Sequence, residues 1–211
     1  MKKIVCLLAG VFACFQLFSQ GVDFKSVSLK EALEQAKTQG KMVFVDCYTT
    51  WCGPCKMMTE QVFSQKEAGD FFNTHFVNVK FDMEKGEGKE LSTRFKIRAY
   101  PTFLLLEPDG TERYRIVGGG DLEEFIGRVS RGLQEKNSLP VLEKEFKTGK
   151  MSKRRMLDLV MTLQDAYDGD RLKIVAEELV KRLTFNEKVS TPYWVIYEDN
   201  SLSPLIISHS C

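Results

Sequence analysis

Residues 51–56, Trp-Cys-Gly-Pro-Cys-Lys, constrain this chain more than any other stretch, because they hold Cys52 and Cys55 two residues apart. Residues 41–48 before them are apolar, with β-branched and aromatic side chains, which predicts a buried strand. Residues 56–63 after them predict a helix. Cys52 is therefore expected at a helix N-terminus, where free N–H groups and the helix dipole favour a thiolate.

A Cys-x-x-Cys pair can also be half of a zinc site. A closed zinc site needs a second pair of Cys or His residues at ligand spacing. The two histidines, His75 and His209, stand alone in the sequence. We therefore interpret Cys52 and Cys55 as a redox-active dithiol–disulfide pair, and we expect neither a metal nor a further cofactor.

The N-terminus predicts export. Two lysines at positions 2–3 precede the apolar-rich residues 4–18, and small or polar residues 19–21 follow, which predicts a secretory signal peptide over residues 1–20. The apolar run is shorter than the roughly 20 residues of a membrane-spanning helix. Two alternatives remain open: an uncleaved membrane anchor, and a lipoprotein signal acylated at Cys14.

Net charge and cysteine content argue against a nucleic-acid-binding protein and against a disulfide-rich scaffold. The net charge of +1 becomes −1 without the two lysines of the signal, so no basic face for nucleic acid is expected. Four cysteines remain after residue 20, too few for a disulfide scaffold. Of the two outside the pair, Cys211 is terminal, and Cys47 is expected to be a small buried apolar residue.

The rest of the sequence predicts alternating helices and strands. Ser28 and Glu31 have the spacing of a capping box, and Ser64 and Asp121 are expected to cap the helices that they precede. We expect helices at residues 29–39, 56–63, 64–72, 90–95 and 122–129, and strands at 41–48, 75–82, 103–106 and 111–117. This order predicts an α/β fold, a mixed sheet with helices on both faces.

Several motifs in this order resemble one known family. The Trp-Cys-Gly-Pro-Cys-Lys motif, the Tyr100-Pro101-Thr102 segment, the Asp109-Gly110 turn and the Val117-Gly118 pair are similar to the active-site and groove motifs of thioredoxin. The resemblance covers residues 22–134 and implies a thioredoxin-like domain over residues 21–136. Tyr48 and Glu60 depart from the family pattern, which has a second Trp and a helix-kinking Pro at these positions.

The resemblance implies a role for each residue near the pair. Cys52 is expected to be the exposed attacking thiolate, and Cys55 the resolving thiol. Asp46 falls on the buried acid of the family and is expected to accept the proton of Cys55 through water. Lys80 falls on the lysine that pairs with this acid, and is expected to support proton transfer.

The resemblance also implies a groove for an extended substrate. Pro101, if its peptide bond is cis, would present backbone to a substrate strand opposite the pair. The residues expected to form this groove are Trp51, Gly53, Pro54, Tyr100, Pro101 and Gly118.

Residues 137–211 predict a small all-helical extension. Apolar residues recur at helical spacing near 141–146, 156–163 and 172–183, and again from 193 onward. Short connections between these segments predict antiparallel neighbours, and no repeat period is visible. The charges between the apolar positions are expected on a solvated face.

Taken together, these features predict an exported thiol–disulfide oxidoreductase in the bacterial periplasm. We expect it to reduce or isomerise disulfides in protein substrates, with a membrane-bound electron donor. Two alternatives stay open: a dedicated reductant for cytochrome c maturation, and a non-catalytic module whose helical extension binds a partner.

Overall fold

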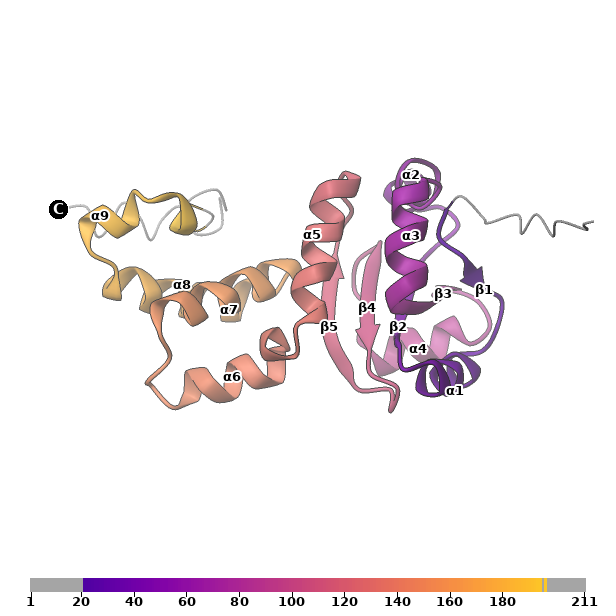
Figure 1. Cartoon of the computed structure of the whole chain (residues 1–211), viewed down its shortest axis with the longest axis horizontal. Coiled ribbons are helices and arrows are strands. Elements are labelled where there is room, and N and C mark those ends of the chain that lie inside the picture. Colours follow the sequence, from indigo (N-terminus) through magenta and orange to yellow (C-terminus); the bar gives the residue numbers. More distant parts are fainter. Residues whose placement is uncertain (1–20, 195, 197–211) are drawn as a thin grey trace, which may run out of the picture.

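The computed structural model describes residues 21–194 and 196, which form a sheet unit followed by a helical unit (Figure 1). The predicted signal peptide, His209 and Cys211 lie outside the described residues. Across the part of the chain that is described, no helix is both long and apolar enough to cross a membrane.

The sheet has five strands in the order β1-β3-β2-β4-β5. They are β1 (Phe24–Lys25), β2 (Met42–Tyr48), β3 (Phe76–Asp82), β4 (Thr102–Leu106) and β5 (Glu112–Val117). β3 pairs in parallel with β1 and β2, whereas β4 pairs antiparallel with β2 and β5. The predicted mixed sheet is therefore confirmed. The sequence did not indicate β1, because two residues are too few to show an alternating pattern.

Helices cover both faces of this sheet. α1 (Leu29–Gln39) and α4 (Gly88–Arg94) pack on one face. On the other face, over a cluster of phenylalanines, pack α3 (Lys66–His75), α5 (Leu122–Leu133) and the π-helical turn Met58–Val62 that continues α2 (Gly53–Met57). Because strand side chains alternate between faces, Phe44 points into the second core while Val45 and Cys47 point into the first. The functionally important consequence is that Asp46 shares a face with α2.

The helix ends show which local predictions hold. The capping box between Ser28 and Glu31 is present, and Asp121 accepts a hydrogen bond from the Glu124 N–H. Ser64 does not cap α3, so that prediction is wrong. Its hydroxyl donates to the Glu60 carbonyl at 2.6 Å, because the preceding helix continues as a π-helix over Met58–Val62 and ends next to it.

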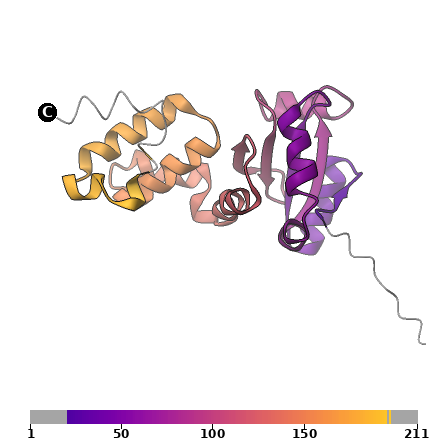
Figure 2. The same cartoon turned by 90° about the horizontal axis from the view of Figure 1, so that it is seen from above.

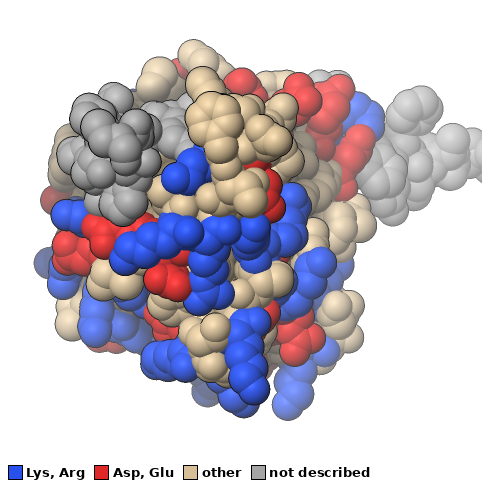
Figure 3. All heavy atoms as spheres, turned by 90° about the vertical axis from the view of Figure 1, so that its left-hand side faces the viewer, with Lys and Arg blue, Asp and Glu red and all other residues tan. Residues whose placement is uncertain are grey.

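The helical unit lies beside the sheet unit (Figure 2), and it has its own core. It contains α6 (Leu139–Lys147), α7 (Lys153–Asp165), α8 (Gly169–Arg182), α9 (Phe185–Lys188) and the 3-10 turns Glu135–Asn137 and Thr191–Tyr193. The predicted all-helical extension is confirmed. Ile196 is helical, and most of the helix predicted from 193 onward lies outside the described residues. The short helix at Phe185–Lys188 was not predicted. Thr184 and Glu187 form a capping box there, a sequence signal that would have located it. Figure 3 shows basic and acidic side chains interspersed on the outer face of this unit, as expected of a solvated face.

A buried ionic cluster joins the two units. Asp165, at the end of α7, accepts hydrogen bonds from Tyr114 Oη and Arg128 Nε, both at 2.7 Å, and from Arg131 at 2.9 Å. The Asp165 side chain is 6% exposed, and that of Arg128 11%. The helical unit is thus fixed to β5 and α5, the last two elements of the sheet unit.

Candidate active site

Cys52 and Cys55 form a disulfide at the start of α2. Cys52 is the N-cap residue, and its Sγ accepts the Cys55 N–H at 3.1 Å. Pro54 lies in the first turn, where no intrahelical N–H partner is lost. The helix N-terminus is thus directed at Cys52 Sγ, which stabilises negative charge on that sulfur after reduction.

The accessibility of Cys52 differs from the prediction. Cys52 is 3% exposed and Cys55 is 4% exposed, so the predicted exposure of Cys52 is wrong for the oxidised pair. Gly53 and Pro54 between them are exposed instead. Because the two cysteines are equally buried, exposure does not distinguish the nucleophile. The Cys55 N–H, which is directed at Cys52 Sγ, identifies Cys52 as the nucleophile.

A π-helical turn follows the pair, where Glu60 replaces the proline of the family pattern. It closes with a hydrogen bond from the Phe63 N–H to the Met58 carbonyl at 2.8 Å. Met58 is buried beneath the loop after β5, and a Cβ on Gly119 would come within 2.7 Å of its Sδ. The sequence pattern predicted an ordinary helix here, since apolar spacing over one turn does not separate α from π.

Asp46 is buried on the sheet face that α2 covers. It is 2% exposed, and its Oδ1 has no hydrogen-bond partner among the described residues. Burial raises the pKa of Asp46 to about 7, against the opposing charge of Lys80. A carboxyl group with this pKa can accept a proton near neutral pH.

Lys80 is the neighbour of Asp46 on β3. Within the described residues the two form no ion pair, and the Lys80 ammonium lies 5.6 Å from the centre of the Phe24 ring. Lys80 therefore acts on Asp46 through its charge rather than through a contact. Its support of proton transfer stays a prediction.

Cys47 lies on the opposite face from Asp46, as expected. It is 1% exposed within the core beneath α1 and α4. Burial, and then the charge of Asp46, raise the pKa of its thiol well above the usual value. The predicted small buried residue is confirmed, and a thiol of this kind is unreactive.

Four of the predicted groove residues, Trp51, Tyr100, Pro101 and Gly118, come together at a cis peptide bond between Tyr100 and Pro101. The part of Gly53 and Pro54 in the groove stays a prediction. The Gly118 N–H donates to the Pro101 carbonyl at 2.9 Å, and Gly118 has a φ of 80°. A left-handed backbone of this kind favours glycine. The Tyr100 ring meets the exposed Trp51 ring edge-on, with centroids 5.8 Å apart. Pro101 itself is buried, and the exposed part of this surface is the Trp51 ring beside Tyr100.

Two functional contacts were not predicted. The Trp51 indole N–H donates to the carboxylate of Glu84, at 3.0 and 3.1 Å, from the turn between β3 and α4. Arg128 donates to the carbonyls of Val117 at 2.9 Å and Gly119 at 3.4 Å, on either side of Gly118. The first contact joins segments 33 residues apart, and the second joins α5 to the segment just before it. Neither Glu84 nor Arg128 belongs to a motif.

Comparison with known proteins agrees with this geometry. A family model described as a thioredoxin-like domain matches residues 29–131. Thioredoxin-1 of Drosophila melanogaster is 41% identical over 91 residues, which cover 43% of this chain and 78% of that protein. The chain belongs to the thioredoxin family. It is a thioredoxin-like thiol–disulfide oxidoreductase, and Cys52 and Cys55 form a disulfide in it.

Two further matches are a much longer protein and a chain that the match covers almost completely. A thiol:disulfide interchange protein DsbD of Pseudomonas fluorescens is 34% identical over 103 residues, 47% of this chain. The chain spans 18% of the length of that protein. The solution structure of a candidate disulphide-isomerase from Bacteroides thetaiotaomicron is 46% identical, with a TM-score of 0.50. That match covers 54% of this chain and 94% of the other.

Proposed function

We propose that this protein is an exported oxidoreductase that reduces or isomerises disulfides in protein substrates. The observation that supports the proposal most strongly is the hydrogen bond from the Cys55 N–H to Cys52 Sγ, next to the exposed Trp51 ring and the cis-proline segment that this ring contacts. A polarised sulfur next to a cis-proline segment and an exposed aromatic ring suits an extended polypeptide substrate better than a small molecule.

The proposed cycle has two exchange steps. The Cys52 thiolate attacks one sulfur of a substrate disulfide, which forms a mixed disulfide and releases the other substrate sulfur as a thiolate. Cys55, deprotonated by Asp46, then attacks Cys52 Sγ. This second step forms the Cys52–Cys55 disulfide, releases the remaining substrate thiolate and leaves the substrate reduced by two electrons. No cofactor other than the cysteine pair is required.

The proposed setting is the bacterial periplasm, reached through the signal peptide over residues 1–20. A membrane-bound dithiol donor would return two electrons to the Cys52–Cys55 disulfide after each reduction. The relatives named as an interchange protein and a candidate disulphide-isomerase support protein thiols and disulfides as partners. Cleavage of the exported chain after residue 20, measured by N-terminal sequencing of the secreted protein, tests the location.

In the reduced protein, Cys52 is expected to react before Cys55. A helix N-terminus stabilises an anion by about 1 kcal/mol, which lowers a thiol pKa by nearly one unit. Limiting iodoacetamide at pH 7 should therefore label Cys52 about fivefold faster than Cys55, as measured by peptide mass spectrometry. The buried Cys47 is the internal control and should stay unlabelled. Faster labelling of Cys55 would overturn the assignment of the nucleophile.

The Cys52–Cys55 pair is expected to be reducing. Pairs with Gly-Pro between the cysteines lie near −270 mV in thioredoxin, whereas strongly oxidising relatives lie near −120 mV. Gly53 and Pro54 place no cation beside Cys52, so the thiolate gains little extra stabilisation. Equilibration with glutathione buffers measures the potential. A midpoint above about −180 mV, the value of an isomerase, would make this protein an oxidant.

A further inference from the structure

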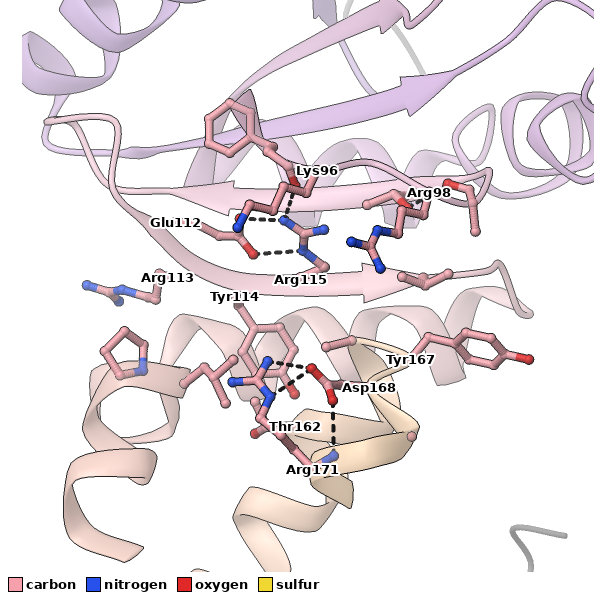
Figure 4. A pocket seen from close by; sticks show the side chains of 18 of the residues that line it. Lys96, Arg98, Glu112, Arg113, Tyr114, Arg115, Thr162, Tyr167, Asp168 and Arg171 are labelled. Carbon is pink, nitrogen blue, oxygen red and sulfur yellow. Dashed lines mark hydrogen bonds and ion pairs between the residues drawn. The ribbon is translucent and has the colours of Figure 1, made fainter. Parts of the chain in front are cut away.

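A cavity of about 880 Å³ lies between the two units, along β5 (Figure 4). Lys96 and Arg98, from the connection between α4 and β4, line one wall together with β5. The opposite wall comes from α6 and from the turn between α7 and α8, which contributes Tyr167 and Asp168. The helical unit therefore creates a space that the sheet unit alone would leave as open surface.

This cavity adjoins the substrate groove. Ala99, Thr102 and Val117 line it, and they are the sequence neighbours of the Tyr100–Pro101 peptide and of Gly118. In Figure 4, Arg98 and Tyr167 lie at the end of the cavity where β5 ends, which is the end next to Gly118. An extended chain that pairs at the cis-proline can therefore continue into the cavity.

The unpaired charges in the cavity are mostly positive. Glu112 is paired with Arg115 at 2.7 Å, and Asp168 accepts a hydrogen bond from Arg171 at 2.8 Å (Figure 4). Three lining cations have no acidic partner among the described residues: Arg94, Lys96 and Arg98. One lining acid, Asp170, has no basic partner among these residues. The cavity thus offers unpaired cations next to the groove, with Lys96 and Arg98 exposed to an incoming chain.

Unusual backbone occurs on both walls. Among the described residues, the non-glycine residues with positive φ are Lys96, at 52°, and Tyr167, at 56°. This conformation is uncommon outside glycine and often marks sites of function. Tyr167 is 82% exposed, so its ring is available at the edge of the cavity opposite Lys96 and Arg98.

We propose that this cavity extends the substrate groove and receives an acidic segment of a protein substrate. The inference rests on the proposed function, because it concerns the segment next to the substrate cysteine. Carboxylates of such a segment would pair with Lys96 and Arg98, and Tyr167 would contact its apolar parts. The cavity between the two units would thus determine which disulfides are reduced, while Cys52 and Cys55 carry out the exchange.

The test uses single-turnover reduction of peptides by the pre-reduced full-length protein, so no electron donor is needed. The peptides share one disulfide loop and differ in three residues on one flank, which are Glu, Gln or Lys, and a second set places them on the other flank. Acid quenching and mass spectrometry give the second-order rate constant. In one of the two sets, the Glu peptide should react about fivefold faster than the Gln peptide, the effect of one or two exposed ion pairs. The Lys peptide of that set should be slowest, and 0.5 M salt should shrink the differences.

Variants distinguish recognition by the cavity cations from an effect of the protein's net charge. In Lys96→Gln/Arg98→Gln the ratio of the Glu to the Gln rate should fall to about one. Lys30→Gln/Lys89→Gln removes the same charge from exposed positions outside the cavity and should keep the fivefold ratio. Lys96→Gly/Arg98→Gln is a second cavity variant, in which the Glu to Gln ratio should also fall to about one. Glycine adopts the left-handed backbone at position 96 without strain.

Each outcome is decisive. Equal rates for the three peptides of both sets overturn the cavity inference and leave the proposed function standing. A preference for the Glu peptide that persists in both cavity variants places the recognition elsewhere and also overturns it. If the reduced wild-type protein reduces none of the peptides, the proposed function itself fails.

Discussion

Replacing Asp46 by Asn is expected to slow the release of substrate from the Cys52 mixed disulfide by about 10²-fold, within the usual range for a general base. Asp46 lies on the face that α2 covers, and burial raises its pKa to about 7, so it can take the Cys55 proton at neutral pH. The first attack by Cys52 needs no such base and should change far less. Rapid quenching with alkylation resolves the two steps, and equal slowing of both would make Asp46 purely structural.

The same substitution should stabilise the protein at alkaline pH. The folded-state pKa of Asp46 is raised from 3.8 to about 7, so its contribution to stability is complete below about pH 4 and is lost as pH rises through 7. At 1.36 kcal/mol per pH unit, the loss amounts to about 4 kcal/mol. Asn cannot ionise, so Asp46→Asn should exceed wild type by up to this amount in free energy of unfolding at pH 8, with no such pH-dependent gain at pH 4.

Asp82→Asn is the matched control for this pH dependence. Asp82 ends the neighbouring strand β3; burial opposes its ionisation, but the Glu84 N–H and Lys85 lower its pKa overall. Its substitution should therefore give no stability gain between pH 4 and pH 8. Urea unfolding across this range measures both variants, and a gain that is the same at pH 4 and pH 8 in Asp46→Asn would contradict the titration of Asp46.

Replacing Asp165 by Ala is expected to lower the free energy of unfolding by about 3 to 5 kcal/mol, the usual cost of leaving a buried charge unpaired. The substitution removes the acceptor shared by Tyr114, Arg128 and Arg131 at the joint between the units. Arg128 would be left buried without its carboxylate, although it still donates to the carbonyls around Gly118. Urea unfolding at pH 7 measures the loss.

Glu178→Ala is the control for Asp165→Ala. Glu178 pairs with Arg182 within α8 at 2.8 Å, but both side chains are about one third exposed. An exposed pair of this kind contributes about 0 to 1 kcal/mol. If Asp165→Ala costs no more than Glu178→Ala, the joint between the units is held by apolar packing rather than by the ionic cluster.

The sequence alone determined the parts of this protein that depend on near neighbours. The strand before Cys52, the helix after it and the capping box at Ser28 follow from local spacing and periodicity. Alternation along β2 placed Asp46 and Cys47 on opposite faces, as the structure has them. The cis-proline segment and the groove glycine followed from the family resemblance, and the extension was correctly predicted to be helical.

The tertiary structure decided whatever depends on distant residues. The burial of Cys52, the contact of Trp51 with Glu84 and the cluster at Asp165 join segments that no local pattern connects. The pKa of Asp46 likewise depends on how completely α2 and the sheet exclude water from its carboxyl group. Residue spacing specifies which elements form, but how closely two of them approach is set by the packing of the whole core, and the site's electrostatics follow from that packing.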